Sequence, residues 1–310
     1  MTLTRNKIEI CLLGCGQWGK LILRDLINLG CDVTVVDPDK DAQSLALDTG
    51  ASTVASNCSN LPPTIKGFIV ATPASSHFDT ICSTLSYQKP IFVEKPLTTD
   101  SHSARQLTRL AGDRIFVMEK WRYHPAVRAM ADMVNSAEFG QLQTIRCKRV
   151  QWGQSQHDVS PIWTLMPHDI SIVHHILGQF PQPVHAYVEY SQDGQPLSIS
   201  ARLQAAGTAV FIDVSSLELK KERKLTLVFE KAVIVMDNPM ADHILLQHRN
   251  NKGDLQISKI AIKPSMPLYD ELKDFIGYLS GDSHDMPGLE VATHSVELIE
   301  ACLSSANRAT

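Results

Sequence analysis

The chain has 310 residues, which is long enough for two domains, and 44% hydrophobic and 20% charged residues are typical of a globular protein. Its formal net charge of −4 provides no excess of positive charge for binding nucleic acid or an anionic membrane. No apolar run is long enough to span a bilayer, and no signal peptide precedes the first predicted strand. We therefore expect a cytoplasmic protein.

The cysteines argue against a disulfide framework. There are seven of them, an odd number, and no CxxC pattern occurs, so the sequence predicts neither paired disulfides nor a zinc knuckle. Several lie in apolar runs and are expected to be small buried side chains. Cys15 differs from these because it lies inside a glycine-rich loop.

The beginning of the chain has the pattern of a dinucleotide-binding fold. A short apolar strand at residues 8–13 leads directly into the sequence GCGQWG at residues 14–19. Apolar residues at helical spacing follow and stop at Gly30, and a second strand then ends in Asp37. Strand, glycine loop, helix, strand and acid in this order form the dinucleotide fingerprint in its required context.

Each glycine of this loop has a separate physical role. Gly14 makes the tight turn, Gly16 lets the backbone approach a pyrophosphate, and Gly19 lets the helix pack closely on the strand. The N–H groups at the start of the helix can then bind the phosphates. Asp37 is placed to bind both ribose hydroxyls and would repel a 2′-phosphate, so we expect NAD rather than NADP.

Strands and helices continue to alternate up to residue 118. Strands are predicted at 52–54, 67–71, 91–93 and 115–118, with helices at 41–47, around 81–85 and at 100–111. Ser75 or Ser76 is a candidate cap for the second of these helices. Six strands with intervening helices predict a doubly wound parallel Rossmann sheet. Thr72-Pro73 and Glu94-Lys95-Pro96 then follow strands at the carboxyl edge, where such sheets bind ligands.

Three motifs together resemble the Gfo/Idh/MocA oxidoreductase family, which includes glucose–fructose oxidoreductase, inositol dehydrogenases and nucleotide-sugar 3-dehydrogenases. They are GCGQWG, Ala71-Thr72-Pro73 with His77, and Glu94-Lys95-Pro96. The glycine loop alone is shared with many enzymes, whereas its combination with Glu-Lys-Pro after the fifth strand is specific. The resemblance implies these cofactor-binding residues: Gly14, Gly16, Gln17, Trp18, Gly19, Asp37, Thr72, Pro73, His77, Glu94, Lys95 and Pro96.

After Met118 the pattern changes to that of a second domain. Residues 119–125 resemble the crossover segment of the family, so we expect an NAD-binding Rossmann domain at 1–121 and a substrate-binding and oligomerisation α+β domain at 122–310. Alternating segments between 142 and 247 predict a mostly antiparallel open sheet with helices on one face. The basic run at 220–224 is expected to be a solvated hairpin turn. The resemblance implies that the other face packs against a partner subunit in a homodimer or homotetramer.

One predicted helix interrupts these strands and carries His168. Pro167 suits its first turn and Gly178 its end. Together with Trp163 and Asp169, these residues resemble the family helix that bears the catalytic histidine. The family has an acidic residue four positions before that histidine, and this chain has Thr164 there. Asp169, which is adjacent to His168, could supply the missing negative charge only from a different direction.

The resemblance implies roles for these side chains. Lys95 would bind the reacting oxygen of the substrate, and His168 would exchange its proton as hydride passes to or from the nicotinamide. Substrate-binding candidates are Lys95, Arg122, Tyr123, Thr164 and His168. Trp152 and Trp163 are further candidates for pocket walls, each equally compatible with a core or interface position. No HExxH spacing occurs, so we expect no metal, and a structural or solvated role for His174 and His175.

Three functions are consistent with this pattern. The first is an NAD-dependent oxidoreductase that transfers hydride between nicotinamide and a hydroxyl or keto carbon of a sugar, cyclitol or nucleotide sugar. The second is an NAD-binding regulator without catalytic activity, which Thr164 suggests and the intact Glu-Lys-Pro motif argues against. The third is an NAD(P)H-dependent reductase of a non-sugar substrate.

Overall fold

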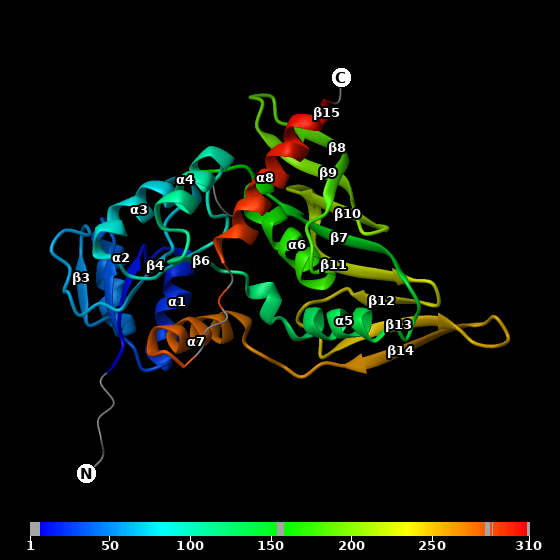
Figure 1. Ribbon diagram of the computed structural model, residues 1–310, viewed down its shortest axis with the longest axis horizontal. Helices are drawn as coiled ribbons and strands as arrows, with labels where there is room; N and C mark the ends of the chain where they lie inside the picture. Colours follow the sequence, from blue (N-terminus) through cyan, green and yellow to red (C-terminus); the bar gives the residue numbers. More distant parts are fainter. Residues whose placement is uncertain (1–6, 154–157, 283–285, 287, 309–310) are drawn as a thin grey trace, which may run out of the picture. The chain divides into compact units, whose positions relative to one another are not determined.

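The computed structural model describes residues 7–153, 158–282, 286 and 288–308. Contacts divide the chain into two compact units (Figure 1). The first comprises Met1–Lys120 with Pro267–Thr293, and the second comprises Trp121–Met266 with His294–Thr310. None of the helices in the described part of the chain combines the length and the apolar character that a membrane crossing requires.

The first unit contains a six-stranded parallel sheet with the order β3-β2-β1-β4-β5-β6, as the alternating pattern predicts. Its strands are β1 (Glu9–Leu13), β2 (Asp32–Val36), β3 (Thr53–Ala55), β4 (Gly67–Val70), β5 (Ile91–Val93) and β6 (Ile115–Val117). Its helices are α1 (Gln17–Asn28), α2 (Lys40–Thr49), α3 (His77–Thr84), α4 (Ser101–Ala111) and α7 (Pro267–Ser280), with 3₁₀ turns η1 (Ala74–Ser76) and η2 (Leu85–Tyr87). The strand order reverses between β1 and β4, where such sheets bind ligands.

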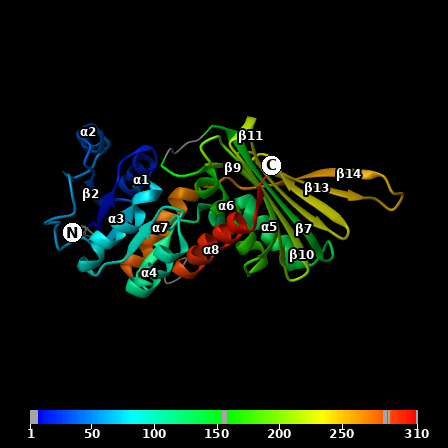
Figure 2. The ribbon, with the colours of Figure 1, turned by 90° about the horizontal axis from the view of Figure 1, so that it is seen from above.

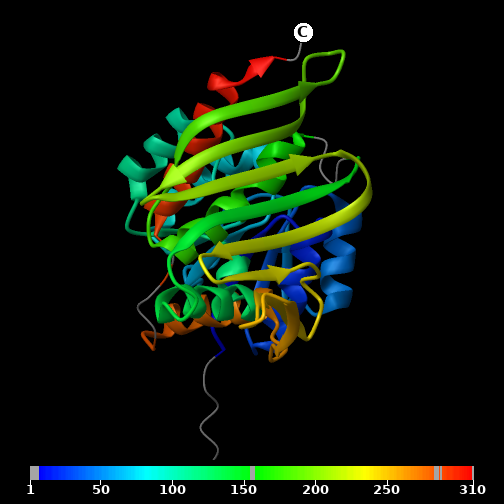
Figure 3. The ribbon, with the colours of Figure 1, turned by 90° about the vertical axis from the view of Figure 1, so that its right-hand side faces the viewer.

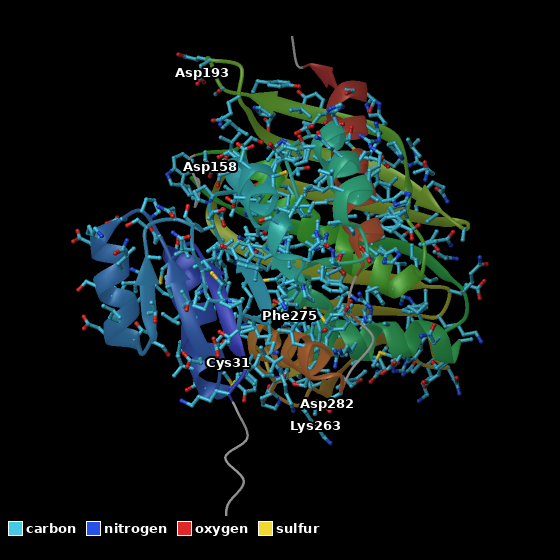
Figure 4. All side chains as sticks on the ribbon, turned by 60° about the vertical axis from the view of Figure 1, so that its left-hand side comes forward. Cys31, Asp158, Asp193, Lys263, Phe275 and Asp282 are labelled. Atoms are coloured by element: carbon cyan, nitrogen blue, oxygen red, sulfur yellow. The ribbon has the colours of Figure 1, made fainter. Side chains whose placement is uncertain are left out.

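Helix α7 belongs to the first unit although it follows the second unit's sheet in sequence. Phe275, labelled on α7 in Figure 4, is fully buried. Its ring stacks on that of Phe92 of β5 at a centroid distance of 4.9 Å. The same ring lies 6.5 Å from that of Phe116 on β6. Sequence patterns alone assigned residues 122–310 to the second domain. The aromatic contacts place α7 with the Rossmann sheet.

The second unit is built on a nine-stranded sheet with the order β14-β13-β12-β11-β7-β10-β9-β8-β15. Its pairings are antiparallel except for β7 with β10 and β8 with β15, which confirms the mostly antiparallel expectation. The strands are β7 (Leu142–Trp152), β8 (Gln182–Tyr190), β9 (Pro196–Ala205), β10 (Thr208–Ser215), β11 (Leu217–Phe229), β12 (Ala232–Met236), β13 (His243–Arg249), β14 (Leu255–Ala261) and β15 (Asn307–Arg308).

Helices cover one face of this sheet. Helix α6 (Pro161–Leu177) packs on β7, β9 and β10, and α5 (Pro125–Ser136) packs against α6 (Figure 2). The 3₁₀ turn η3 (Lys120–Tyr123) precedes α5, and α8 (Leu289–Ser305) precedes β15. Figure 3 looks onto the opposite, open face of the sheet. Thirteen residues of α6 are buried, so the helix is covered by other parts of the protein on nearly every side.

Three local expectations differ from the structure. The basic run at 220–224 lies within β11 instead of a hairpin turn, because the strand continues past a register shift between Leu217 and Glu222. Helix α6 begins at Pro161, so Pro167 lies inside the helix and removes one of its backbone hydrogen bonds. Ser76 does not cap α3, since its hydroxyl donates to the carbonyl oxygen of Pro73.

Candidate functional site

Gly14 and Gly16, between β1 and α1, and Gly19, in the first turn of α1, give this segment a packed side and an open side. A Cβ at Gly14, where φ is +90°, would lie 2.8 Å from the carbonyl oxygen of Ala71, and one at Gly19 would lie 2.2 Å from the carbonyl oxygen of Gly14. Nothing lies within 4 Å of a Cβ built at Gly16. A phosphate group could therefore approach the backbone on the Gly16 side, next to the N-terminus of α1.

Asp37 lies beside this loop at the end of β2. Its Oδ2 accepts a hydrogen bond from the Cys15 N–H at 2.8 Å, and its Oδ1 accepts one from the Asp39 N–H at 2.9 Å. The side chain of Gln43 donates to the Asp37 carbonyl oxygen at 2.6 Å. Burial, followed by the charge of Asp37, raises the pKa of the Cys15 thiol. Cys15 is consequently a packed thiol of the loop and not a reactive thiolate.

A pocket of about 560 Å³ opens at the carboxyl ends of β1, β2 and β4. This volume is within the range of small-molecule sites. Its lining residues are Leu13, Val36, Pro38, Asn57, Cys58, Ser59, Thr72, Thr80, Ser83, Ser86 and Tyr87. Of these, Thr72 alone was predicted from the sequence to bind the cofactor. The segment after β3, which supplies three of the residues, has no motif that could have revealed it.

His77 connects the two loops that follow β4 and β5. It is 1% exposed, with Nδ1 2.7 Å from the Pro96 carbonyl oxygen and Nε2 3.0 Å from the Thr72 carbonyl oxygen. Burial lowers the pKa of His77, and the two carbonyl contacts oppose this shift. A neutral ring carries one N–H, so it donates to one of the two carbonyls at a time. Both ring nitrogens face the protein backbone, which suits His77 to positioning the two loops.

Glu94, Lys95 and Pro96 follow β5 directly. The Glu94 N–H donates to the Val70 carbonyl oxygen at 2.8 Å, which continues the β4–β5 pairing by one residue. The Glu94 side chain accepts a hydrogen bond from the Lys95 N–H at 3.1 Å, and the Lys95–Pro96 peptide bond is cis. Lys95 is half-buried. The motif therefore lies at the carboxyl edge of the same parallel sheet as the glycine loop.

A buried carboxyl group on α7 interacts with this motif. Glu271 is 1% exposed, and among the described residues its Oε2 has no hydrogen-bond partner. Burial, reinforced by the charge of Glu94 and opposed by that of Lys120, raises its pKa well above the usual range, while the backbone of Glu119 supplies a hydrogen bond. The amine of Lys120 lies 4.2 Å from the ring centroid of Trp18, in the glycine loop.

Neither Glu271 nor Lys120 was predicted from the sequence to lie near the site. The position of Glu271 in the sequence is nevertheless recognisable as unusual. It occupies the same helical stripe as Leu272 and Phe275, which are fully buried. A carboxylate within an apolar stripe is unusual, because burial of its charged form is costly. Lys120 had no comparable signal.

In the second unit, α6 positions His168. The helix begins with Pro161 at its first turn and ends at Gly178, where φ is +67° and the N–H donates to the His174 carbonyl oxygen at 2.8 Å. His168 is half-buried within a stretch of otherwise buried residues. Its ring meets that of Trp121 edge-on, at a centroid distance of 6.2 Å.

Two polar residues near His168 on the same helix have other partners. Thr164 is buried, and its hydroxyl donates to the Pro161 carbonyl oxygen at 3.0 Å, so part of its hydrogen-bonding capacity serves its own helix. Asp169 accepts three hydrogen bonds from Arg149, at 2.8 to 3.1 Å. The Asp169 charge is thereby neutralised by an arginine.

The other second-unit candidates are dispersed. Arg128 donates to the Arg122 carbonyl oxygen at 2.7 Å, and its guanidinium lies 4.9 Å from the ring centroid of the buried Tyr123. Trp163 is buried at 9% exposure, and Trp152 is 66% exposed. These positions suit a core residue and a surface residue, respectively.

The histidines of α6 show no sign of metal binding. Burial lowers the pKa of His175, and the charges of Arg122, Arg128 and His174 lower it further. The His174 ring stacks on Phe180 at 4.2 Å. Within the described residues, no group of three or more histidine, cysteine or acidic side chains could hold a metal ion.

Comparison with known proteins identifies relatives of both the first unit and the whole fold. Residues 8–117 match the model of an oxidoreductase family, Gfo/Idh/MocA, with an NAD-binding Rossmann fold. Inositol 2-dehydrogenase of Mycolicibacterium smegmatis is 30% identical over 152 residues, which cover 46% of this chain and 44% of that protein. Inositol 2-dehydrogenase of Renibacterium salmoninarum is 27% identical over 149 residues, or 45% of each chain. The matches thus span less than half the length of these relatives.

Two solved structures share the fold along nearly the whole chain. UDP-N-acetylglucosamine 3-dehydrogenase of Acidithiobacillus ferrooxidans has a TM-score of 0.82 at 16% identity, covering 97% of this chain and 98% of that one. Levoglucosan dehydrogenase in complex with NADH and levoglucosan has a TM-score of 0.84 at 15% identity, covering 97% of both chains. Such low identities establish the fold alone. Residues 8–117, an NAD(P)-binding Rossmann domain, therefore belong to the Gfo/Idh/MocA oxidoreductase family, and inositol 2-dehydrogenases are distant homologues.

Proposed function

We propose that the protein is an NAD-dependent oxidoreductase that transfers hydride between nicotinamide and a hydroxyl or keto carbon of a sugar, cyclitol or nucleotide sugar. The observation that carries this proposal is Lys95, a half-buried amine at the carboxyl edge of the sheet that holds the glycine loop. A redox regulator or scaffold would have little need for an amine there. The inositol, levoglucosan and nucleotide-sugar dehydrogenases among the relatives support a polyhydroxylated substrate.

The cofactor-binding role rests on the loop geometry. The open side of Gly16 and the start of α1 would bind the pyrophosphate, and Asp37 would bind the adenosine ribose. The fixed Asp37 carboxylate favours NAD over NADP, because it would repel a 2′-phosphate. Thr72 and Pro96 would be positioned by His77. The remaining proposed cofactor residues are Gly14, Gln17, Trp18, Gly19, Pro73, Glu94 and Lys95.

In the proposed reaction, an alcohol loses hydride to the oxidised nicotinamide and a proton to the protein, which leaves a carbonyl group. Lys95 would donate a hydrogen bond to the reacting oxygen and stabilise negative charge that develops there. His168 would take the hydroxyl proton, since imidazole is suited to proton transfer near neutral pH. Arg122, Tyr123 and Thr164 are the proposed substrate contacts. The reverse reaction uses the same groups.

The test is a screen for NADH formation with inositols, monosaccharides, levoglucosan and nucleotide sugars. Lys95→Met should lower turnover by about 10²-fold or more while leaving NADH affinity nearly unchanged, because it removes an interaction made with the reacting oxygen. Lys66→Met is the matched control, since Lys66 is an exposed lysine just before β4 at the opposite edge of the sheet. Unchanged turnover in Lys95→Met would refute the assignment of Lys95.

The main alternative is an NAD-binding regulator without catalytic activity. Thr164 motivates it, because a threonine cannot provide the negative charge that an acidic residue would offer to His168. It predicts NADH binding without NADH formation across the whole screen. A reductase of a non-sugar substrate would instead oxidise NADH or NADPH with unsaturated or imine compounds, so both reduced cofactors should be tested.

The proposal includes a homodimer or homotetramer formed through the sheet of the second unit. Exposed apolar side chains on its strands include Trp152, at 66% exposure, and Leu219, at 84%. Trp152 lies directly opposite Leu217, which is 42% exposed, in the β7–β11 register, and large apolar side chains exposed near one another are typical of association surfaces. Light scattering should give a mass above 34.3 kDa, and Leu219→Asp should shift the protein towards the monomer. A monomer at micromolar concentration would refute this part of the proposal.

A further inference from the structure

A buried ion pair joins α6 to the sheet of the second unit directly beside His168. Arg149 of β7 donates through Nε to both oxygens of Asp169, at 3.1 and 2.9 Å, and through Nη2 to Oδ1 at 2.8 Å. Arg149 is 4% exposed and Asp169 is 2% exposed. Asp169 is the residue after His168. The ion pair therefore ties the turn of α6 that carries the histidine to β7.

The contribution of this pair to stability does not explain its presence. Desolvation of two charges offsets their attraction, and well-packed apolar residues often replace such pairs without loss of stability. Arg149 also lies directly opposite Arg223 in the β7–β11 register, where like charges repel. Burial and the nearby Arg149 charge lower the pKa of Arg223 to about 10. A charge arrangement that is costly to bury indicates a role in orienting neighbouring groups.

Trp121 connects the ion pair to the histidine ring. The Arg149 guanidinium lies 4.6 Å from the Trp121 ring centroid, and the His168 ring meets the same indole edge-on at 6.2 Å, with an interplanar angle of 65°. His124 stacks on the indole at 5.1 Å. Its Nε2 lies 2.9 Å from the Pro239 carbonyl oxygen, which fixes that ring in turn. Arg149 and His168 thus contact one immobilised aromatic side chain.

We infer that Arg149, Asp169 and Trp121 form a positioning set that orients the imidazole of His168 for proton transfer. This inference rests on the proposed function of His168. The ion pair fixes the turn of α6 at His168, and the guanidinium and the histidine ring share the indole. Asp169 acts through Arg149, which neutralises its charge. In this arrangement, packing against Trp121 orients the His168 ring. It takes the place of the acidic residue that the family has where this chain has Thr164.

The principal test replaces both charges at once. The variant Arg149→Met/Asp169→Leu removes the pair without leaving an unpaired buried charge, so the fold should persist. Lys148→Met/Glu222→Gln is the matched control, because this ion pair joins β7 to β11 at 3.0 Å, and Lys148 is the residue before Arg149 on β7, with its side chain on the opposite face of the sheet. Urea unfolding and NADH affinity establish that each variant is folded and binds cofactor.

The first readout is the NMR signal of the His168 ring in protein labelled with ¹³C at histidine Cε1, assigned through His168→Gln. The ring current of Trp121 should shift this signal in the wild type and in the control. In the Arg149→Met/Asp169→Leu variant the shift should be lost. This readout requires neither substrate nor turnover, so it remains informative if the proposed function fails.

The second readout is kcat with whichever polyol of the screen gives NADH. A misplaced catalytic group reduces kcat by about 10²-fold, and KM should change little. A folded double variant with an unchanged His168 signal and unchanged kcat would overturn the inference. If His168→Gln itself leaves kcat intact, the proposed function fails instead, and the NMR result still decides whether the set orients the ring.

A second variant covers the case in which the double variant does not fold. Trp121→Phe keeps the ion pair and shortens the aromatic surface between Arg149 and His168. Trp121 Nε1 has no hydrogen-bond partner among the described residues, so this substitution forfeits no hydrogen bond. The His168 signal should again move and kcat should fall. Wild-type values for both in a folded Trp121→Phe protein would overturn the inference.

Discussion

Replacement of Glu271 by glutamine should change how the stability of the protein depends on pH. Glu271 is 1% exposed, and burial raises its pKa well above the usual range. Between the ordinary carboxyl pKa of the unfolded chain and this raised value, the folded protein binds one proton more than the unfolded chain. The free energy of unfolding must therefore fall as pH rises through that window.

The magnitude follows from proton linkage. One group that is protonated when folded and ionised when unfolded contributes a slope of about 1.4 kcal/mol per pH unit. Glutamine cannot ionise, so Glu271→Gln removes this slope. The amide oxygen can still accept the hydrogen bond that the Glu119 backbone supplies. Relative to wild type, the variant should gain up to about 1.4 kcal/mol of stability for each unit of pH increase.

Urea unfolding of both proteins from about pH 5 to about pH 8 provides the measurement, with the m-value checked at each pH. Asp274→Asn is the control for the general loss of a carboxylate, since Asp274 lies on the same helix and is only half-buried. A constant difference between Glu271→Gln and wild type over the whole range would refute the reasoning. It would mean that Glu271 folds in its ionised form.

Four further changes test the first unit. Gly19→Ala should destabilise the protein by about 1–3 kcal/mol, as measured by urea unfolding, because its Cβ would lie 2.2 Å from the Gly14 carbonyl oxygen. Gly16→Ala should leave stability within about 1 kcal/mol of wild type but weaken NADH binding, since the new methyl group projects into open space. Asp37→Ser should weaken NADH binding and improve NADPH binding in fluorescence titrations, and an unchanged preference would contradict the assigned role. His77→Ala should cost about 1–3 kcal/mol in urea unfolding, because the buried carbonyl that accepts the ring N–H would lose its donor.

The order of elements in the first unit could be predicted because its signals are local. The glycine loop and the apolar strand of residues 91–93 each depend on a few neighbouring residues. The second sheet was predicted less completely. Strand β14 was missed because six of its seven residues are exposed, so it lacks a buried alternation. Strand β11 contains a charged run that resembles a turn, yet cross-strand pairing extends it.

The candidate site could be predicted only where one motif contains it. Glu94-Lys95-Pro96 and the helix of His168 were recognisable because their residues are adjacent in sequence. The Arg149–Asp169 pair joins residues 20 positions apart, and neither residue belongs to a pattern that indicates the other. Glu271 approaches Glu94 only because Phe275 packs on Phe92. Periodicity reveals which face of a helix is buried but not which strand it contacts.

The protonation of Glu271 determines the charge near the candidate cofactor site. Two lysines, Lys95 and Lys120, and two glutamates, Glu94 and Glu119, sum to zero if all four are charged. An ionised Glu271 would make the sum −1, which would repel the pyrophosphate of a dinucleotide. Burial raises the pKa of Glu271 and so disfavours its charged form, while the amine of Lys120 lies 4.2 Å from the ring centroid of Trp18 in the first turn of α1. Helix α7 thus brings a carboxyl group to this region in an environment that disfavours a negative charge, which would weaken the loop as an anion site.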